Sequence, residues 1–304
     1  NVLAQAAHSS TRPLRLCANN VPKMAPVKFD DIGKTAKEVL NDDYKTSGYE
    51  FKAKQKTSFD GAVLTSTVDL FPAKDSCMTP AKLSWKLPKP LGCPVVSIDK
   101  LEMDKTGGVK IEASSEKLMK DVKVECKTDA SDISKLVAGI TYTGIANAQL
   151  KAETKVMKPQ DCVFEATYAS KVGGAACTVG LKGTAANIAA PDLGVRVSAG
   201  DLFGSLYAKN KFSAFSANCH YKLSGDVRAA ASYEYGGKAN GQFALGVTYA
   251  VKPGTTVKAK VADDQSISCS VKHDVSKGFT VLAGAKADPA KMSLPSWGIS
   301  LSIE

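Results

Sequence analysis

From about Val109 to the C-terminus the chain repeats one unit, roughly ten residues of alternating apolar and polar or small side chains followed by a turn. The last segment shows the pattern clearly, because Trp297, Ile299, Leu301 and Ile303 alternate with Gly298, Ser300, Ser302 and Glu304. Successive side chains of a β-strand point to opposite faces, so each segment has one apolar and one polar face. Many such strands in succession predict an all-β meander that closes on itself.

The alternation begins at Tyr49 and, with turn signals such as Gly173-Gly174 and Pro253-Gly254, divides the chain into short strands. Five prolines between residues 72 and 98 interrupt the pattern there. At about 13 residues per strand and turn, between about 17 and 19 strands fit after residue 48. The pattern places strands at residues 49–53, 64–70, 83–87, 109–113, 122–126, 136–142, 146–152, 164–168, 177–181, 195–199, 202–206, 215–221, 227–235, 243–249, 257–261, 267–271, 279–285 and 297–303.

The polar faces of these strands favour a barrel with a wet interior. They consist mostly of Gly, Ser, Thr, Ala, Lys and Glu, whereas a soluble sandwich needs bulky residues on both inner faces. A propeller would repeat with a period of about 40 residues, which the sequence lacks. No run of 18 apolar residues predicts a transmembrane helix. A transmembrane β-barrel satisfies every backbone group without an open edge, and we expect that fold over residues 46–304.

One stretch before the strands has a helical pattern. Phe29, Ile32, Ala36, Val39 and Leu40 share one face of a helix predicted over residues 29–43. Asp30 and Asp31 lie at its start, where negative charge suits the helix dipole, and Gly33 weakens the first turn. Residues 1–23 contain basic residues but no acid, which is typical of an organellar presequence or of an extension before Met24. We assign residues 24–45 to the helical segment.

Two parts of the chain resemble eukaryotic mitochondrial porins, the voltage-dependent anion channels. Residues 249–271, "YAVKPGTTVKAKVADDQSISCSV", resemble the hairpin that is characteristic of this family, including Lys260-Val261 before a polar turn and Ser268 after it. "FDDIGKTAKEVLNDDY" resembles the family's N-terminal helix, and "LMKDVKVE" its Gly-Leu-Lys segment. The sequence departs from the pattern at Lys252, Cys269, Asp121-Val122 and Asp42, and a membrane-facing glutamate of some members aligns near Asp99.

The resemblance implies a barrel of 19 strands in the mitochondrial outer membrane, with its first and last strands parallel and the N-terminal helix inside the pore. It also implies passive, voltage-dependent exchange of ions and anionic metabolites such as ATP, ADP and phosphate. A gating role for the helix would involve Asp31, Gly33, Lys34 and Lys37. Such a channel works in a lipid bilayer, alone, as a homo-oligomer or within a larger membrane assembly.

The charges independently favour anions. The chain has 40 Lys and Arg against 30 Asp and Glu, and the polar strand faces hold more bases than acids. A basic wall around water concentrates anions, although salt screens charges over about 8 Å at physiological strength. We expect contacts with phosphate groups at Lys34, Lys37, Lys123, Lys258 and Lys260. The predicted lumenal bases are Lys52, Lys54, Lys82, Lys86, Lys110, Lys123, Lys127, Lys182, Arg196, Arg228, Lys258 and Lys260.

No constellation of residues predicts an enzyme, a metal site, a cofactor or a nucleic-acid partner. The three histidines share no spacing with acids or cysteines that suggests catalysis or metal binding. The eight cysteines form no CxxC pair, which favours a reducing compartment. Three other readings stay open: a protein-translocase barrel, whose lumen should be more acidic, a structural subunit of a membrane assembly, and a soluble basic β-rich binding protein.

Overall fold

The computed structural model describes residues 26–57, 61–69, 81–185, 188–237, 241–289 and 293–304, so the predicted extension over residues 1–23 lies outside the described residues. The described chain forms a 19-stranded sheet and short helices. In chain order the elements are η1 (Phe29–Asp31), α1 (Lys34–Leu40), β1 (Gly48–Lys56), β2 (Val63–Asp69), β3 (Ala81–Leu87), η2 (Pro90–Gly92), β4 (Ser97–Asp104), β5 (Val109–Met119), β6 (Val122–Asp129), β7 (Asp132–Tyr142), β8 (Ala148–Lys155), β9 (Lys158–Val172), β10 (Ala175–Thr184), β11 (Asp192–Ala199), β12 (Leu202–Lys209), β13 (Ala214–Lys222), β14 (Val227–Tyr235), β15 (Gln242–Lys252), β16 (Thr255–Ala262), β17 (Ile267–Ser276), β18 (Phe279–Asp288) and β19 (Ser293–Ile303).

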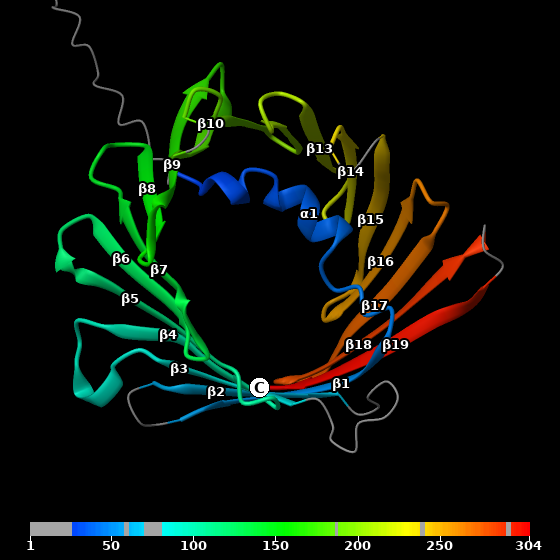
Figure 1. Cartoon of the computed structure of the whole chain (residues 1–304). Coiled ribbons are helices and arrows are strands. Elements are labelled where there is room, and N and C mark those ends of the chain that lie inside the picture. The colour runs from blue at the N-terminus through cyan, green and yellow to red at the C-terminus, as the bar shows by residue number, and fades with distance from the viewer. Residues whose placement is uncertain (1–25, 58–60, 70–80, 186–187, 238–240, 290–292) are drawn as a thin grey trace, which may run out of the picture.

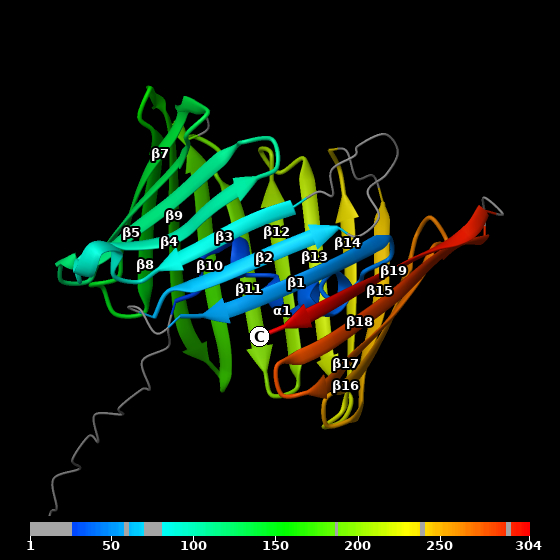
Figure 2. The same ribbon diagram turned by 90° about the horizontal axis from the view of Figure 1, so that it is seen from below.

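The sheet closes into a barrel. Each strand pairs antiparallel with the next, and β1 pairs in parallel with β19, from Gly48 opposite Gly298 to Ala53 opposite Ile303. Figure 1 shows the closed ring end-on with α1 inside it, and Figure 2 shows the tilted strands from the side. The prediction of an all-β barrel of about 19 strands with an N-terminal helix in its interior is confirmed. Every strand of the described sheet has a neighbour on both sides, as a lipid environment requires.

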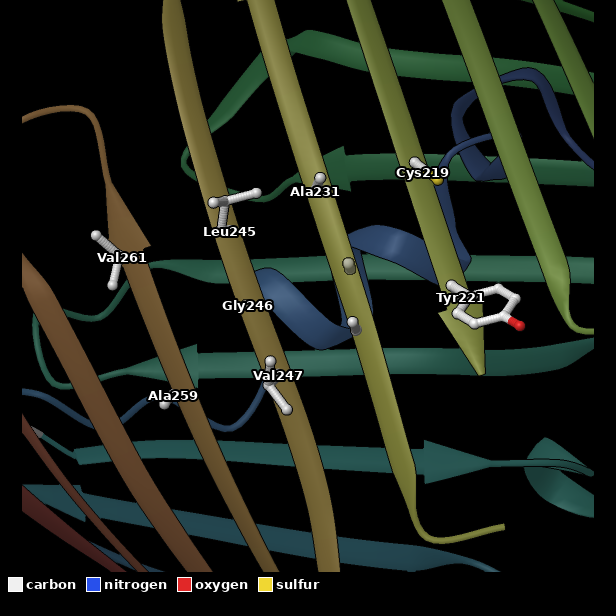
Figure 3. Close-up of a pocket in the computed structure, with 10 residues that line it drawn as sticks. Cys219, Tyr221, Ala231, Leu245, Gly246, Val247, Ala259 and Val261 are labelled. Carbon is white, nitrogen blue, oxygen red and sulfur yellow. The ribbon is translucent and has the colours of Figure 1, made fainter. Parts of the chain in front are cut away.

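The apolar face of the strands is the outer face. Residues whose side chains face the inner helix alternate along the strands with residues that face outward. Leu206, Leu245 and Val247 are of the outward kind, and they are 50%, 53% and 44% exposed. Figure 3 views this outer surface over β13–β16, with α1 behind the strands. A shallow hollow there has a floor of small residues, with Ala231 on β14 between Tyr221 on β13 and Leu245 on β15, and Ala259 on the next strand, β16. Large apolar side chains are exposed on the outer face of most strands from β7 to β19, and such a surface suits contact with lipid.

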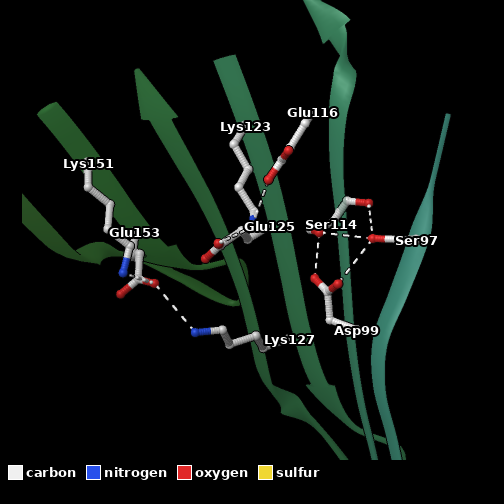
Figure 4. A network of polar contacts seen from close by, with 9 residues as sticks. All are labelled: Ser97, Asp99, Ser114, Glu116, Lys123, Glu125, Lys127, Lys151 and Glu153. Carbon is white, nitrogen blue, oxygen red and sulfur yellow. Dashed lines mark hydrogen bonds and ion pairs between the residues drawn. The ribbon is translucent and has the colours of Figure 1, made fainter. Parts of the chain in front are cut away.

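β4 was not among the predicted strands, and a β-bulge explains the omission. The pairing with β5 shifts register between Ile98 and Lys100, so Asp99 is an extra residue that breaks the period of two. Asp99 accepts hydrogen bonds from the hydroxyl groups of Ser97 and Ser114. Ser114 lies opposite Glu125 on the inner face of the wall, so the Asp99 carboxylate belongs to the lumen side (Figure 4).

The predicted helix over residues 29–43 is two shorter pieces. The 3-10 turn η1 ends at Asp31, and α1 runs only from Lys34 to Leu40, with Gly33 between them. Glycine costs about 1 kcal/mol relative to alanine inside a helix, and here it separates the two pieces. Among the described helices, none is long and apolar enough to cross a membrane.

Arginine substitutions at two neighbouring residues of β3 test the orientation of the strands. Leu83 faces outward and pairs with Met103, whereas Ser84 faces inward opposite Glu102. We expect Leu83→Arg to lower the free energy of unfolding by about 2–4 kcal/mol if Leu83 lies near the bilayer midplane. Ser84→Arg, which puts the charge into the lumen near an acid, should change it little. Reversible urea unfolding in lipid vesicles measures both, and equal losses would contradict the orientation.

Candidate functional site: the lumen and its N-terminal segment

The N-terminal segment, residues 26–47, lies against one side of the inner wall. η1 contacts β9 and β10, and α1 contacts β13, β14 and β15. Its apolar side chains face the wall, where Phe29 and Ile32 pack with Tyr207, and Ala36, Val39 and Leu40 pack with Phe203 and Ala230. The helix face predicted from its apolar spacing is therefore the docking face. The segment narrows the lumen from one side (Figure 1).

Inward-facing glycines make room for these side chains. A Cβ at Gly180 would lie 2.7 Å from Ile32 Cδ1, and one at Gly194 would lie 2.9 Å from the same atom. At the other end of the helix, a Cβ at Gly246 would lie 2.9 Å from Leu40 Cδ2. Real Cβ atoms do not approach other carbons this closely, so larger residues would push the segment away from the wall.

The linker from α1 to β1 also rests on glycine. A Cβ at Gly284 would lie 2.5 Å from the carbonyl oxygen of Lys45, and one at Gly298 would lie 2.7 Å from the backbone nitrogen of Ser47. Gly284 and Gly298 are paired across β18 and β19. The linker backbone therefore lies directly on the wall where β19 meets β1.

Tyr207 fastens the break between η1 and α1. The Gly33 N–H donates to Tyr207 Oη at 2.7 Å, and this hydroxyl lies 3.3 Å from the Phe29 carbonyl oxygen, to which it donates. The phenol is 2% exposed, and its ring meets the Phe29 ring edge-on. A buried hydroxyl that satisfies backbone groups at a helix end replaces the partners that the break removes.

Lys258 lies beneath the other end of the segment. Its ammonium group donates to the carbonyl oxygens of Glu38 and Asp42 at 2.9 and 3.0 Å, and the residue is 8% exposed. The last carbonyls of a helix lack partners within the helix and carry the negative end of its dipole. The charge of Lys258 is therefore largely compensated by the segment.

The other predicted phosphate contacts lie in different surroundings. Lys34 is exposed on α1, and the Lys37 ammonium stands 5.5 Å from the centre of the Tyr207 ring. Lys260 stands 5.1 Å from the centre of the Tyr44 ring. Lys123, on the wall away from the helix, forms ion pairs with Glu116 and Glu125 at 3.2 and 3.4 Å. The fold thus gathers Lys34, Lys37, Lys258 and Lys260 along the segment and leaves Lys123 apart.

The wall away from the helix carries acids and bases in pairs. Glu153 lies 2.8 Å from Lys151 and 3.8 Å from Lys127, and Lys100 lies 2.7 Å from Glu102. Figure 4 shows part of this network on β4–β8. Because neighbouring charges of opposite sign cancel at distances longer than their separation, the paired residues add little to the mean potential of the pore.

Tyr44 in the linker is half-buried. Its hydroxyl donates to the Val39 carbonyl oxygen at 3.3 Å, and burial raises the pKa of Tyr44 to about 12. Since the protonated phenol is the favoured form of the docked linker, its contribution is complete below pH 10 and is lost as the pH rises through about 12.

Sequence reasoning missed Tyr207, Phe203 and the glycines beneath the segment. Phe203 and Tyr207 alternate with Leu202 and Leu206, so they fall on the face that elsewhere holds small or polar residues. Two large aromatic side chains on a lumenal face could have indicated that another part of the chain packs there, because such residues need a partner that covers them.

A closed barrel with an apolar outer belt, a charged lumen and a segment folded inside is the architecture of a porin, a multi-pass outer-membrane barrel. The sequence matches the eukaryotic porin family over residues 25–296. The chain belongs to this family and is a membrane-embedded channel for small solutes.

Similarities to individual proteins are distant. No protein with a curated description matches the sequence. Among solved structures, an engineered variant of the Rhodopseudomonas blastica porin is similar with 9% identity and a TM-score of 0.43, covering 84% of this chain and 94% of its own. The Pseudomonas aeruginosa protein OccK11 is similar with 9% identity and a TM-score of 0.35, covering 80% of this chain and 84% of its own. Neither similarity supports a further conclusion.

Two glycine substitutions test whether the wall positions the segment. In Gly194→Val the new side chain collides with Ile32 and Phe29, whereas a Cβ at Gly204 on the adjacent strand meets no described atom within 4 Å. We expect Gly194→Val to cost about 1–3 kcal/mol of docking free energy, by overpacking, and Gly204→Val to cost little. Hydrogen exchange of the α1 amides should accelerate in the first variant alone. Equal exchange in both variants would show that the glycines do not hold the segment.

Proposed function

We propose that this porin is a voltage-gated, weakly anion-selective channel of the mitochondrial outer membrane. Ions and anionic metabolites such as ATP, ADP and phosphate diffuse through its lumen. Family membership supports the membrane and the passive mechanism, and the charge of the lumen supports the preference for anions.

The observation that carries the proposal is the excess of unpaired bases on the lumen face. Within the described residues, seven acids on this face have no ion-pair partner, namely Asp69, Asp99, Asp104, Glu112, Asp192, Glu234 and Asp274. In the same described part of the chain, at least nine bases on this face have no such partner, a small excess over the acids, namely Lys82, Lys86, Lys110, Lys171, Arg196, Lys209, Lys222, Arg228 and Lys260. The N-terminal segment, which is described throughout, adds equal numbers of unpaired bases and acids, namely Lys28, Lys34, Lys37, Asp31, Glu38 and Asp42. A lumen with this balance raises the local concentration of anions and lowers that of cations.

The proposed preference is weak because the charges are screened. At physiological ionic strength the Debye length is about 8 Å, so ions near the axis of a wide pore feel only part of the wall potential. Selectivity of this kind is graded and decreases as salt increases. We propose Lys34, Lys37, Lys123, Lys258 and Lys260 as residues that meet phosphate groups, with Lys258 reached only when the helix moves.

The proposed gating element is the N-terminal segment, with Asp31, Gly33, Lys34 and Lys37 at its centre. The segment carries charge within the pore, and its helix is interrupted at Gly33. Moving one elementary charge through the full membrane potential changes the free energy by about 2.3 kcal/mol per 100 mV, comparable to a few hydrogen bonds.

Planar-bilayer recording of the purified full chain tests the proposal. Under a KCl gradient we expect large current steps and partial closure at either polarity as the voltage rises. We expect a reversal potential displaced from zero toward the equilibrium potential of chloride. The chloride preference should weaken in 1 M salt, where the Debye length is about 3 Å. A reversal potential on the potassium side at low salt would contradict the proposed selectivity.

Charge reversals at the lumenal lysines provide a sharper test. We expect Lys123→Glu combined with Lys260→Glu to move the reversal potential toward potassium while the segment stays docked. Lys258→Glu should also release the helix end, because a carboxylate would face the carbonyl oxygens of Glu38 and Asp42. The same double reversal at the turn residues Lys211 and Lys277 is the control, and we expect it to have a smaller effect. An unchanged reversal potential in the lumenal variants would contradict the assignment.

A further inference from the structure

Acidic side chains tie both ends of the N-terminal segment to lysines of the wall. Near the start of the segment, the Asp30 carboxylate accepts hydrogen bonds from Lys182 Nζ at 3.0 and 3.1 Å. Beyond the end of α1, Asp43 Oδ2 lies 3.4 Å from Lys272 Nζ and 3.6 Å from Lys258 Nζ. Three wall lysines, on β10, β16 and β17, therefore each have an ionic partner on the segment.

These lysines face the inside of the barrel. Leu181, the neighbour of Lys182 on β10, is exposed on the outer face, so Lys182 points into the lumen. Lys182 also forms an ion pair with Glu165 of the wall at 2.8 Å. Lys258 is 8% exposed, and its ammonium group contacts the carbonyl oxygens of Glu38 and Asp42 on the segment. With the segment removed from the wall, Lys258 and Lys272 would face the lumen without an acid in contact.

The composition of the segment matches this role. Residues 26–47 contain the acids Asp30, Asp31, Glu38, Asp42 and Asp43 and the bases Lys28, Lys34, Lys37 and Lys45. The two acids with wall partners neutralise wall lysines, while Lys34 remains exposed on α1. The docked segment thus places carboxylates on basic sites that mobile anions would otherwise occupy.

We propose that Asp30 and Asp43 set the strength of the anion preference by acting as built-in counter-ions of the wall. The inference rests on the proposed function, since it concerns the selectivity of the same lumen. While the segment is docked, Lys182, Lys258 and Lys272 are partly neutralised, and the pore is only weakly selective. When the segment leaves the wall, Lys258 and Lys272 face the solution without an acid in contact, Lys182 keeps only Glu165, and the preference for anions increases.

A pair of matched double variants of the full chain tests this role. Asp30→Asn with Asp43→Asn removes two negative charges and the ion pairs that join both ends of the segment to the wall. Glu125→Gln with Glu153→Gln removes the same charge from ion pairs within the wall, to Lys123, Lys127 and Lys151. Both pairs of changes keep the size of the side chains, and circular dichroism in detergent checks that both barrels fold.

We expect the two double variants to differ in two measurements. In low-salt bilayers, the reversal potential of the Asp30 and Asp43 variant should move further toward chloride than that of the Glu125 and Glu153 variant. Hydrogen exchange of α1 should accelerate about tenfold in the first and stay unchanged in the second, as the loss of three partly exposed ion pairs predicts. Asp30→Glu with Asp43→Glu, which keeps both charges, should restore the behaviour of the unchanged protein.

Equal shifts in the reversal potential of the two variants would overturn the inference, because then only the total charge of the lumen matters. No shift in the Asp30 and Asp43 variant would also overturn it. These outcomes are separate from a failure of the proposed function, which would appear as potassium preference, or no pores, in the unchanged protein.

Discussion

The structure depends on the requirement that every backbone hydrogen-bonding group in a membrane has a partner within the protein. Lipid offers none, so the strands pair all the way round, including β1 with β19. Once the sheet is closed, the period of two assigns one set of side chains to lipid and the other to the lumen. The same constraint that holds the barrel together therefore also creates a polar passage through it.

The lumen is asymmetric because the N-terminal segment covers only one side. On that side the wall holds glycines where Ile32 and Leu40 dock, and Tyr207 binds the break at Gly33. On the opposite side, lysines and glutamates form pairs within the wall. A solute passes between a surface organised around the segment and one organised around its own ion pairs, so the two sides contribute differently to the field in the pore.

Most strands were predictable because the alternation is regular and the turns carry glycine, proline or aspartate. β4 was not, since the bulge at Asp99 places Ile98 and Leu101 on one face three residues apart. The apolar spacing of residues 29–40 correctly indicated a docking face, but it did not show how far Gly33 would divide the helix. The wall positions beneath it were harder to predict, because a glycine in a strand indicates close approach without indicating what approaches. Likewise, sequence alone places a lysine such as Lys258 on the lumen face. Only the fold shows that its ammonium group donates hydrogen bonds to backbone carbonyl oxygens of the segment.

The parallel contact between β1 and β19 has a consequence for biogenesis. All other neighbours in the sheet are consecutive in the chain, so they can assemble hairpin by hairpin as the polypeptide lengthens. The seam joins Gly48 to Gly298, and it forms only after the final strand has been synthesised. Until that moment two strand edges lie open and ready to pair with other chains. A chain that lacks β19 therefore leaves the edges of β1 and β18 unpaired, and such edges favour aggregation.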